Sequence, residues 1–152
     1  MDIRQWKAAR KKTRKIGQAG ERAAAMMYEQ KGCSVLLRNC KTRRAELDLI
    51  VRDGNTLVFA EVKTLFHRKN SKRLLKPGIN LKLAQRRRIW HGAQAYLDEL
   101  DRPHLPIRFD LVEVICGTWG PEKIFHHTGI FTRQSLWQSL RNQNRQRENR
   151  FY

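Results

Sequence analysis

The sequence predicts one α/β domain in which a central mixed sheet is flanked by helices. Three observations support this prediction: a helix-favouring segment precedes three strand-like segments, a second helical segment follows them, and a further strand-like segment comes after that helix. With 152 residues, the chain is long enough for one domain with a proper core and too short for two comfortable ones. We therefore expect one compact unit with flexible ends.

The first half of this pattern is a helix followed by a meander of strands. Residues 16–31 are rich in Ala and Met, which favour a helix, and Gly32 is a natural stop. Strand signals follow at residues 33–40, 46–52 and 56–64. The last two are separated by the dipeptide Asp53-Gly54, which is typical of two-residue hairpin turns and predicts that these strands pair.

The second half begins with a basic segment, residues 66–80, in which Pro77-Gly78 predicts an exposed loop. Helical periodicity returns at 81–100, and strands are predicted at 107–116 and 123–127. A terminal helix is predicted at 132–143, capped by Thr132. The expected organisation is a basic arm over residues 1–15, mobile or ordered by a partner, a domain over 16–131, and a C-terminal helix and basic tail over 132–152.

The charge of the chain predicts a polyanionic partner. Its 32 Lys and Arg residues outnumber 14 Asp and Glu residues, so the formal net charge is +18. Nucleic acid is the leading partner of so basic a chain. No apolar run approaches the length of a spanning helix and the arm lacks the apolar core of a signal peptide, which predicts no membrane role and a cytoplasmic location. Three cysteines without CxxC spacing predict reduced thiols rather than disulfides or a zinc site.

Polar residues interrupt two of the predicted strands, at Glu46 and Asp48 in one and at Glu61 and Lys63 in the other. Residues two apart lie on the same face of a strand. If Asp53-Gly54 forms a two-residue turn, residue 48 pairs with 59 and residue 46 pairs with 61, which brings both polar pairs to one face of the hairpin.

Such a cluster has two interpretations. Crowded, buried carboxylates are costly unless a cation joins them, and Mg²⁺ prefers oxygen ligands of this kind. A lysine two residues beyond Glu61 would then orient a water molecule or stabilise charge on a phosphate, which is the outline of a nuclease site. Alternatively, these residues line the solvated face of a sheet and Lys63 makes an ordinary ion pair. The pattern alone favours the second interpretation, because it is short and common.

A longer set of motifs resembles a known family. "GQAGERAA" at 17–24, "RN" at 38–39, "AELDLIVRDGNTLVFAEVKT" at 45–64, "AQAYL" at 93–97 and "RFDLVEV" at 108–114 occur in the order and spacing of the YraN-type family of bacterial endonuclease-like proteins. The resemblance covers about residues 16–131. That family is similar in fold to the restriction-endonuclease-like PD-(D/E)xK superfamily, in which an αβββαβ core presents D…ExK to magnesium.

The resemblance implies a role for individual residues. Asp48 and Glu61 match the metal-binding carboxylates, Lys63 matches the catalytic lysine, and Glu21 matches a helix carboxylate that many superfamily members add to the site. It implies a magnesium-dependent endonuclease, with Mn²⁺ as a substitute metal, that hydrolyses phosphodiester bonds of DNA or structured nucleic acid. The sequence departs from the family at Ala45, Leu65 and Gln85, and Gln85 stands where a lysine is expected, although Lys82 lies one turn away. None of these departures removes a predicted metal ligand.

Basic residues beside this cluster predict a rim that binds the phosphate backbone of nucleic acid, with DNA as the leading candidate. These residues are Lys69, Lys72, Arg73, Lys76, Lys82, Arg86, Arg87 and Arg88. Two other functions remain open: a non-catalytic nucleic-acid-binding module, and an RNA- or ribosome-associated assembly protein. The oligomeric state stays open, with a homodimer as one option.

Other polar and aromatic residues have simpler interpretations. Asp110 is expected to form a structural ion pair with Arg108, and Trp90 is expected in the core. His126 and His127 are adjacent, so a strand would point them to opposite faces and they are not expected to share a metal. Glu46 is a metal ligand or a neighbour of the metal site in one interpretation, and a surface residue in the other.

Overall fold

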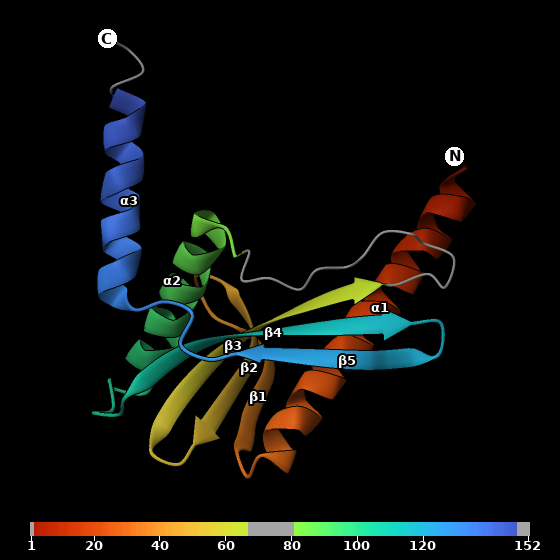
Figure 1. Cartoon of the computed structure of the whole chain (residues 1–152), viewed down its shortest axis with the longest axis horizontal. Coiled ribbons are helices and arrows are strands. Elements are labelled where there is room, and N and C mark those ends of the chain that lie inside the picture. The colour runs from red at the N-terminus through yellow and green to blue at the C-terminus, as the bar shows by residue number, and fades with distance from the viewer. Residues whose placement is uncertain (1, 67–80, 149–152) are drawn as a thin grey trace.

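The computed structural model describes residues 2–66 and 81–148 (Figure 1). Its elements follow the order predicted from sequence, αβββαβ, and a fifth strand and a third helix complete the fold. The elements are α1 (Ile3–Gln30), β1 (Ser34–Lys41), β2 (Glu46–Asp53), β3 (Thr56–Phe66), α2 (Leu83–Glu99), β4 (Ile107–Gly117), β5 (Gly120–His127) and α3 (Arg133–Glu148). The α/β prediction is confirmed.

The five strands form one mixed sheet in the order β1-β2-β3-β4-β5. Neighbouring strands are antiparallel except β3 and β4, which run parallel over ten residue pairs from Leu57 with Ile107 to Phe66 with Cys116. A parallel pair needs a long crossover connection. Helix α2 lies on that connection, so the alternation of strand and helix in the sequence is what makes the sheet mixed.

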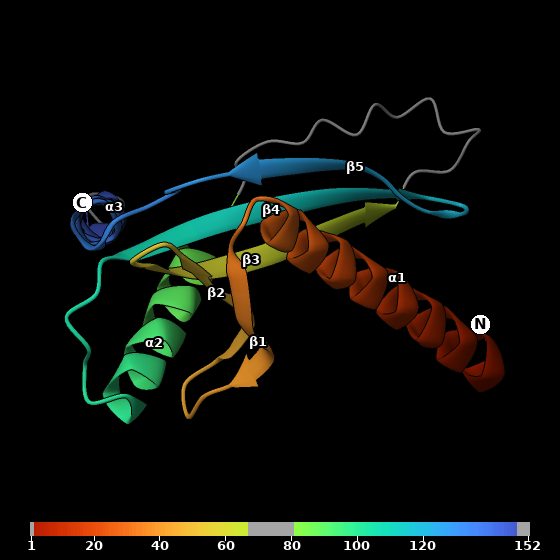
Figure 2. The same cartoon turned by 90° about the horizontal axis from the view of Figure 1, so that it is seen from below.

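Helices cover both faces of the sheet. Ala24, Ala25 and Tyr28 of α1 pack on one face against alternate residues of β2, β3 and β4, including Val58 and Val112. The opposite face packs against α2 through Ile89, Trp90 and Ala93, so Trp90 is in the core as predicted. Figure 2 shows α1 and α2 on either side of the β1–β2 part of the sheet.

Helix α3 packs beside α2 at one end of the molecule, and Leu136 joins the core there (Figure 1). Thr132 caps its start, because Thr132 Oγ1 accepts a hydrogen bond from the Ser135 N–H at 3.2 Å. Within the described residues, 2–66 and 81–148, no helix is long and apolar enough to cross a membrane.

The N-terminal helix is longer than the sequence suggests. It begins at Ile3, so residues 3–15, which the sequence separates as a basic arm, continue α1 without a break. The sequence shows no apolar stripe there, which is why the pattern misses the helix; the residues are nevertheless compatible with one, because Lys and Arg are good helix formers. The four rim residues Lys69, Lys72, Arg73 and Lys76 lie outside the described residues.

The β2–β3 hairpin has a different register from the one predicted. Asp53 pairs with Thr56, so the turn residues are Gly54 and Asn55 rather than Asp53 and Gly54. Gly54 has φ +57 at the first turn position, where type II′ hairpins need glycine. Extending this register places Asp48 opposite Glu61, not opposite residue 59. Because the correction is two residues, Asp48 and Glu61 still share one face. Leu47 packs against α2, so regular alternation does not extend to Glu46, whose side chain is exposed.

Candidate active site

A close contact between α1 and β3 brings the helix onto the C-terminal half of β3. Gly20 is buried, and a Cβ at this position would overlap the side chain of Thr64. Only glycine allows the helix to approach the strand so closely at this point. The next residue of the helix is Glu21, so this contact carries the predicted helix carboxylate to the same part of the sheet as Lys63.

Asp48 lies where the β2–β3 ladder stops. The regular pairing ends with Leu49 and Ala60, and beyond it the Val62 N–H donates a hydrogen bond to Asp48 Oδ2 at 2.8 Å. Burial raises the pKa of Asp48, and the negative charge of Glu61 raises it further. The hydrogen bond from Val62 opposes these effects, and the resulting pKa is about 7. Asp48 is therefore a partly protonated carboxyl at neutral pH.

Glu61 is buried, with 8% of its surface exposed, and pairs with a cation from α2. Arg88 Nη2 donates to Glu61 Oε1 and Oε2 at 2.8 and 2.9 Å, and Arg88 Nη1 donates to the carbonyl of Glu46 at 3.1 Å. Burial raises the pKa of Glu61, while the charges of Arg88 and Lys63 lower it. Arg88 thus compensates Glu61 in part, but the pKa of this carboxyl stays above its usual value.

Glu21 and Lys63 complete the cluster. Glu21 Oε2 accepts a hydrogen bond from Asn39 Nδ2 at 3.0 Å, and Asn39 has φ +49, a left-handed conformation that Asn tolerates better than most residues. The charge of Glu21 is among the causes of the raised pKa of Asp48. Lys63 is half-buried two residues beyond Glu61. The structure therefore brings together all four residues that the sequence places at the catalytic centre.

The donor set fits a metal that the substrate helps to hold. Within residues 2–66 and 81–148, no group of three or more His, Cys, Asp or Glu side chains is arranged to bind a metal. Asp48 and Glu61 offer two carboxylates, which matches the way Mg²⁺ is usually bound, by one or two carboxylates together with water and substrate phosphate. Burial is the main cause of the raised pKa of both carboxyls, and a bound cation would favour their ionised forms.

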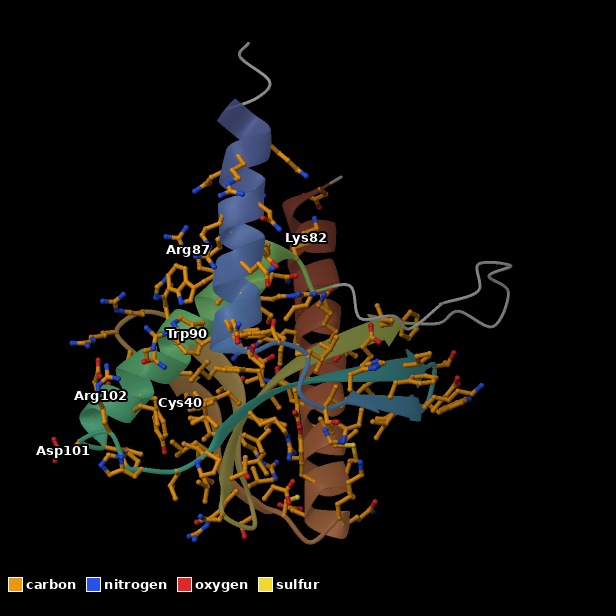
Figure 3. All side chains as sticks on the ribbon, turned by 60° about the vertical axis from the view of Figure 1, so that its left-hand side comes forward. Cys40, Lys82, Arg87, Trp90, Asp101 and Arg102 are labelled. Carbon is orange, nitrogen blue, oxygen red and sulfur yellow. The ribbon has the colours of Figure 1, made fainter. Side chains whose placement is uncertain are left out.

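The remaining rim residues in the described part of the chain lie at the start of α2. Lys82 and Arg87 are exposed, and Figure 3 labels both near this end of the helix, with Trp90 further along it. Arg86 donates to the carbonyl of Leu81 at 3.0 Å. Gln85 accepts a hydrogen bond from the Lys82 N–H at 3.2 Å, so it caps the helix and does not reach the site.

Two partners of the carboxylates escape sequence reasoning. The sequence assigns Arg88 to the basic rim, whereas the structure shows that it contacts Glu61 directly. Asn39 is identified from the sequence only as part of a motif, and it bonds to Glu21. Helical periodicity gives a signal for Arg88, because it lies one turn before Gly92, where α2 packs tightly on Leu47. Glu46 contributes its backbone carbonyl to Arg88, and its side chain is exposed.

A second buried carboxylate lies in a different part of the sheet. Asp110 of β4 contacts Arg108 at 2.9 Å, Tyr28 at 2.9 Å and His126 at 2.9 Å, and it accepts the N–H of Gly129 at 3.0 Å. The predicted ion pair with Arg108 is confirmed. His127 bonds instead to Glu113 at 2.9 Å, so the two histidines diverge as expected.

Comparisons with known proteins agree with the family expected from sequence. The model of "Uncharacterised protein family UPF0102" matches residues 20–114, which include Glu21, Asp48, Glu61 and Lys63. A UPF0102 protein of Symbiobacterium thermophilum is 41% identical over 108 residues, covering 71% of this chain and 88% of the relative. One from Lawsonia intracellularis is 41% identical over 120 residues (79% and 87%), and one from Beutenbergia cavernae is 39% identical over 118 residues (76% and 94%).

Proposed function

The chain belongs to the uncharacterised protein family UPF0102, and we propose that Asp48, near the start of β2, and Glu61, in the middle of β3, form the metal-dependent active site of a nuclease. The family membership confirms the YraN-type resemblance. The kinship with restriction-endonuclease-like enzymes is part of the proposal and is supported by the αβββαβ order of elements.

The observation that carries the proposal is the proximity of the Asp48 and Glu61 carboxyl groups. Two carboxyls with raised pKa values lie side by side, and the hydrogen bond from Val62 fixes the orientation of one of them. Structural ion pairs usually lower the pKa of a carboxyl, whereas perturbed values of this kind concentrate at functional sites. A solvated sheet face, the plainer interpretation of the sequence, does not account for the burial of Glu61.

The proposed reaction is hydrolysis of a phosphodiester bond. Water attacks phosphorus, the bond from phosphorus to the leaving oxygen breaks, and a proton is transferred to that oxygen. When bound, Mg²⁺ would polarise the phosphodiester and offset its charge. Asp48 and Glu61 would hold the ion, Lys63 would orient the attacking water or stabilise charge on the phosphate, and Glu21 would strengthen the negative field that attracts the metal.

The proposed partner is nucleic acid. The net charge of +18 and the exposed cations Lys82 and Arg87 beside the site support binding through the phosphate backbone. Binding of this kind is largely independent of base sequence and weakens steeply with salt. Five or so phosphate contacts on duplex DNA would give a slope of about −4 to −5 in log K against log salt, and a slope near zero would contradict this partner.

The test is a screen for cleavage dependent on Mg²⁺ or Mn²⁺ over single-stranded, duplex, flap and four-way-junction DNA and RNA. We expect Lys63→Ala to remove cleavage of the substrate that responds. Lys123→Ala is the matched control, because Lys123 is an exposed lysine of β5. Equal cleavage by the wild type and Lys63→Ala, in preparations free of contaminating nuclease, would contradict the active-site assignment. Binding without cleavage of any substrate would favour the non-catalytic binding module.

A further inference from the structure

The turn between β4 and β5 exposes a tryptophan at the edge of the molecule. Gly117 pairs with Gly120, so Thr118 and Trp119 form a two-residue turn, and 91% of the surface of Trp119 is exposed. Gly120, with φ +130, supplies the unusual backbone conformation that the turn requires. The turn geometry therefore does not account for a large aromatic ring at residue 119.

Trp119 borders a groove between this turn and α1. The groove has a volume of about 290 Å³, and Ile16 and Ala19 of α1 and Phe66 of β3 give it largely apolar walls. Lys15 supplies a positive charge at its α1 side. The volume is at the lower end of ligand pockets, which suits one planar ring better than a larger molecule.

The groove shares β3 and α1 with the proposed catalytic centre, but it opens on the α1 face of the sheet, where Phe66 packs, whereas Glu61 contacts Arg88 of α2 on the opposite face. Phe66 follows Lys63 by three residues on β3, which corresponds to about 10 Å along a strand. Ala19 precedes Glu21 by two residues on α1. Figure 1 shows the β4–β5 turn at the end of the sheet that the N-terminal half of α1 passes.

We infer that this groove holds one unpaired base of a single-stranded or flap-containing nucleic acid, with the base stacked on Trp119. The inference rests on the proposed function and adds a substrate class to it. Every base has a face that can stack on an aromatic ring, whereas bases within a duplex are already stacked on each other. An exposed tryptophan beside an apolar groove would therefore favour strands with unpaired bases.

The charges around the groove give the bound nucleotide a direction. Lys15 and the exposed Lys11 and Arg14 lie on α1, so the phosphate belongs on that side. At the hairpin side, the carboxylate of Glu122 lies over Gly117, where an added Cβ would overlap it. A carboxylate repels phosphate but can accept a hydrogen bond from the amino group of a base. The base therefore faces the hairpin and the backbone faces α1.

The test measures binding of the full chain to short oligonucleotides in EDTA, by fluorescence anisotropy, so that no metal or cleavage is required. We expect Trp119→Ala to weaken binding to single-stranded DNA by about tenfold, the loss of one stacked base, and Trp119→Phe to retain most of the affinity. Binding to a blunt duplex of the same length should not change. Trp137→Ala, on α3, is the matched control because Trp137 is also exposed, at 41%.

Removing a ring also separates stacking from charge. Trp119→Ala should leave the salt dependence of binding unchanged, whereas Lys15→Gln should reduce the slope by about 0.7 for a single strand. Equal loss on single strand and duplex, or no loss with Trp119→Ala, would overturn the inference, as would a wild-type chain that does not bind single strands. If the expected binding pattern holds and no substrate is ever cleaved, the proposed nuclease function fails and the base-binding groove stands.

Discussion

Two aspartates of the same sheet, Asp48 and Asp110, differ in how the fold compensates their charge. Burial by itself raises the pKa of either carboxyl. For Asp110, hydrogen bonds from His126, Arg108 and the Gly129 N–H more than reverse that effect, and its pKa falls to about 2. For Asp48, the hydrogen bond from Val62 only opposes burial and the charge of Glu61 adds to it, so its pKa rises to about 7.

The difference in charge compensation indicates different roles for Asp110 and Asp48. Asp110 joins β4 to α1 through Tyr28 and to the segment after β5 through Gly129, so its charge holds parts of the fold together. Asp48 lies at the end of a ladder among other acids, and its charge makes folding less favourable at neutral pH. A cation bound beside Asp48 would offset this cost, which is the role proposed for the group.

The largest expected effect separates the two residues by activity. If this protein cleaves a substrate, Asp48→Asn or Glu61→Gln should lower the rate by about a hundredfold to a thousandfold, because each removes a carboxylate that would hold the metal acting on the reacting phosphate. Binding should stay equal or become tighter, since negative charge near phosphate is removed. Rates from single-turnover cleavage and affinities without metal measure the two effects. Cleavage at the wild-type rate by both variants would place the chemistry elsewhere.

The next effect is on stability and concerns the other aspartate. Asp110→Asn should lower the free energy of unfolding by about 3 kcal/mol, because it leaves Arg108 and the surrounding donors without a buried charge to bond. Urea denaturation followed by circular dichroism measures this change. Asp101→Asn, at an exposed position with φ +52 that Asn tolerates, is the control and should change little. A loss no larger than that of the control would show that the Asp110 network is not structural.

A third effect gives the two aspartates opposite responses to pH. The folded pKa of Asp48 lies above its ordinary value of 3.8, so the native state holds a proton that the unfolded chain releases, and stability falls as pH rises from about 4 to about 7. The folded pKa of Asp110 lies below 3.8, so its contribution is present above about pH 4 and is lost as pH falls towards about 2.

Asp48→Asn should therefore stabilise the protein at about pH 8 by about 1–3 kcal/mol relative to its effect at about pH 4. Urea unfolding of both proteins at a series of pH values measures the change. Mg²⁺ should raise the stability of the wild type at high pH and have a smaller effect on Asp48→Asn, because a ligand that binds only the folded state stabilises it. A pH-independent difference between the two proteins would mean that Asp48 is an ordinary surface acid.

The sequence predicts the residues of the candidate site better than their surroundings. Strand alternation alone places Asp48 and Glu61 on one face, and this survives the wrong turn assignment because an error of two residues preserves alternation. Asp53-Gly54 looks like the stronger turn signal, but glycine is needed at the first turn position, so the turn starts one residue later. A local dipeptide preference cannot decide between these registers, whereas packing of the whole hairpin can.

Contacts between distant elements are the part that the sequence does not supply. From its position on α2, Arg88 could contact either phosphate or Glu61. The contact with Glu61 follows from the placement of α2 against β3, which the sequence does not show. The groove at Trp119 likewise joins residues from α1, β3 and the β4–β5 turn, which share no local pattern. The helix over residues 3–15 is missed for another reason, because its charges hide an ordinary helix propensity.

The smallest expected effect tests whether Glu21 belongs with Asp48. Its charge raises the pKa of Asp48, less strongly than burial and Glu61 do, so Glu21→Gln should lower that pKa by less than about one unit. Carbon-detected NMR titration of the Asp48 carboxyl measures the shift directly. Glu29→Gln is the matched control, because Glu29 lies on the same helix and pairs with Arg38 at the surface. A shift in the pKa of Asp48 with Glu21→Gln, but not with Glu29→Gln, would show that Glu21 acts on the same carboxyl as Glu61. If both substitutions leave the titration of Asp48 unchanged, Glu21 interacts with Asn39 and is not part of the negative field that would attract a metal.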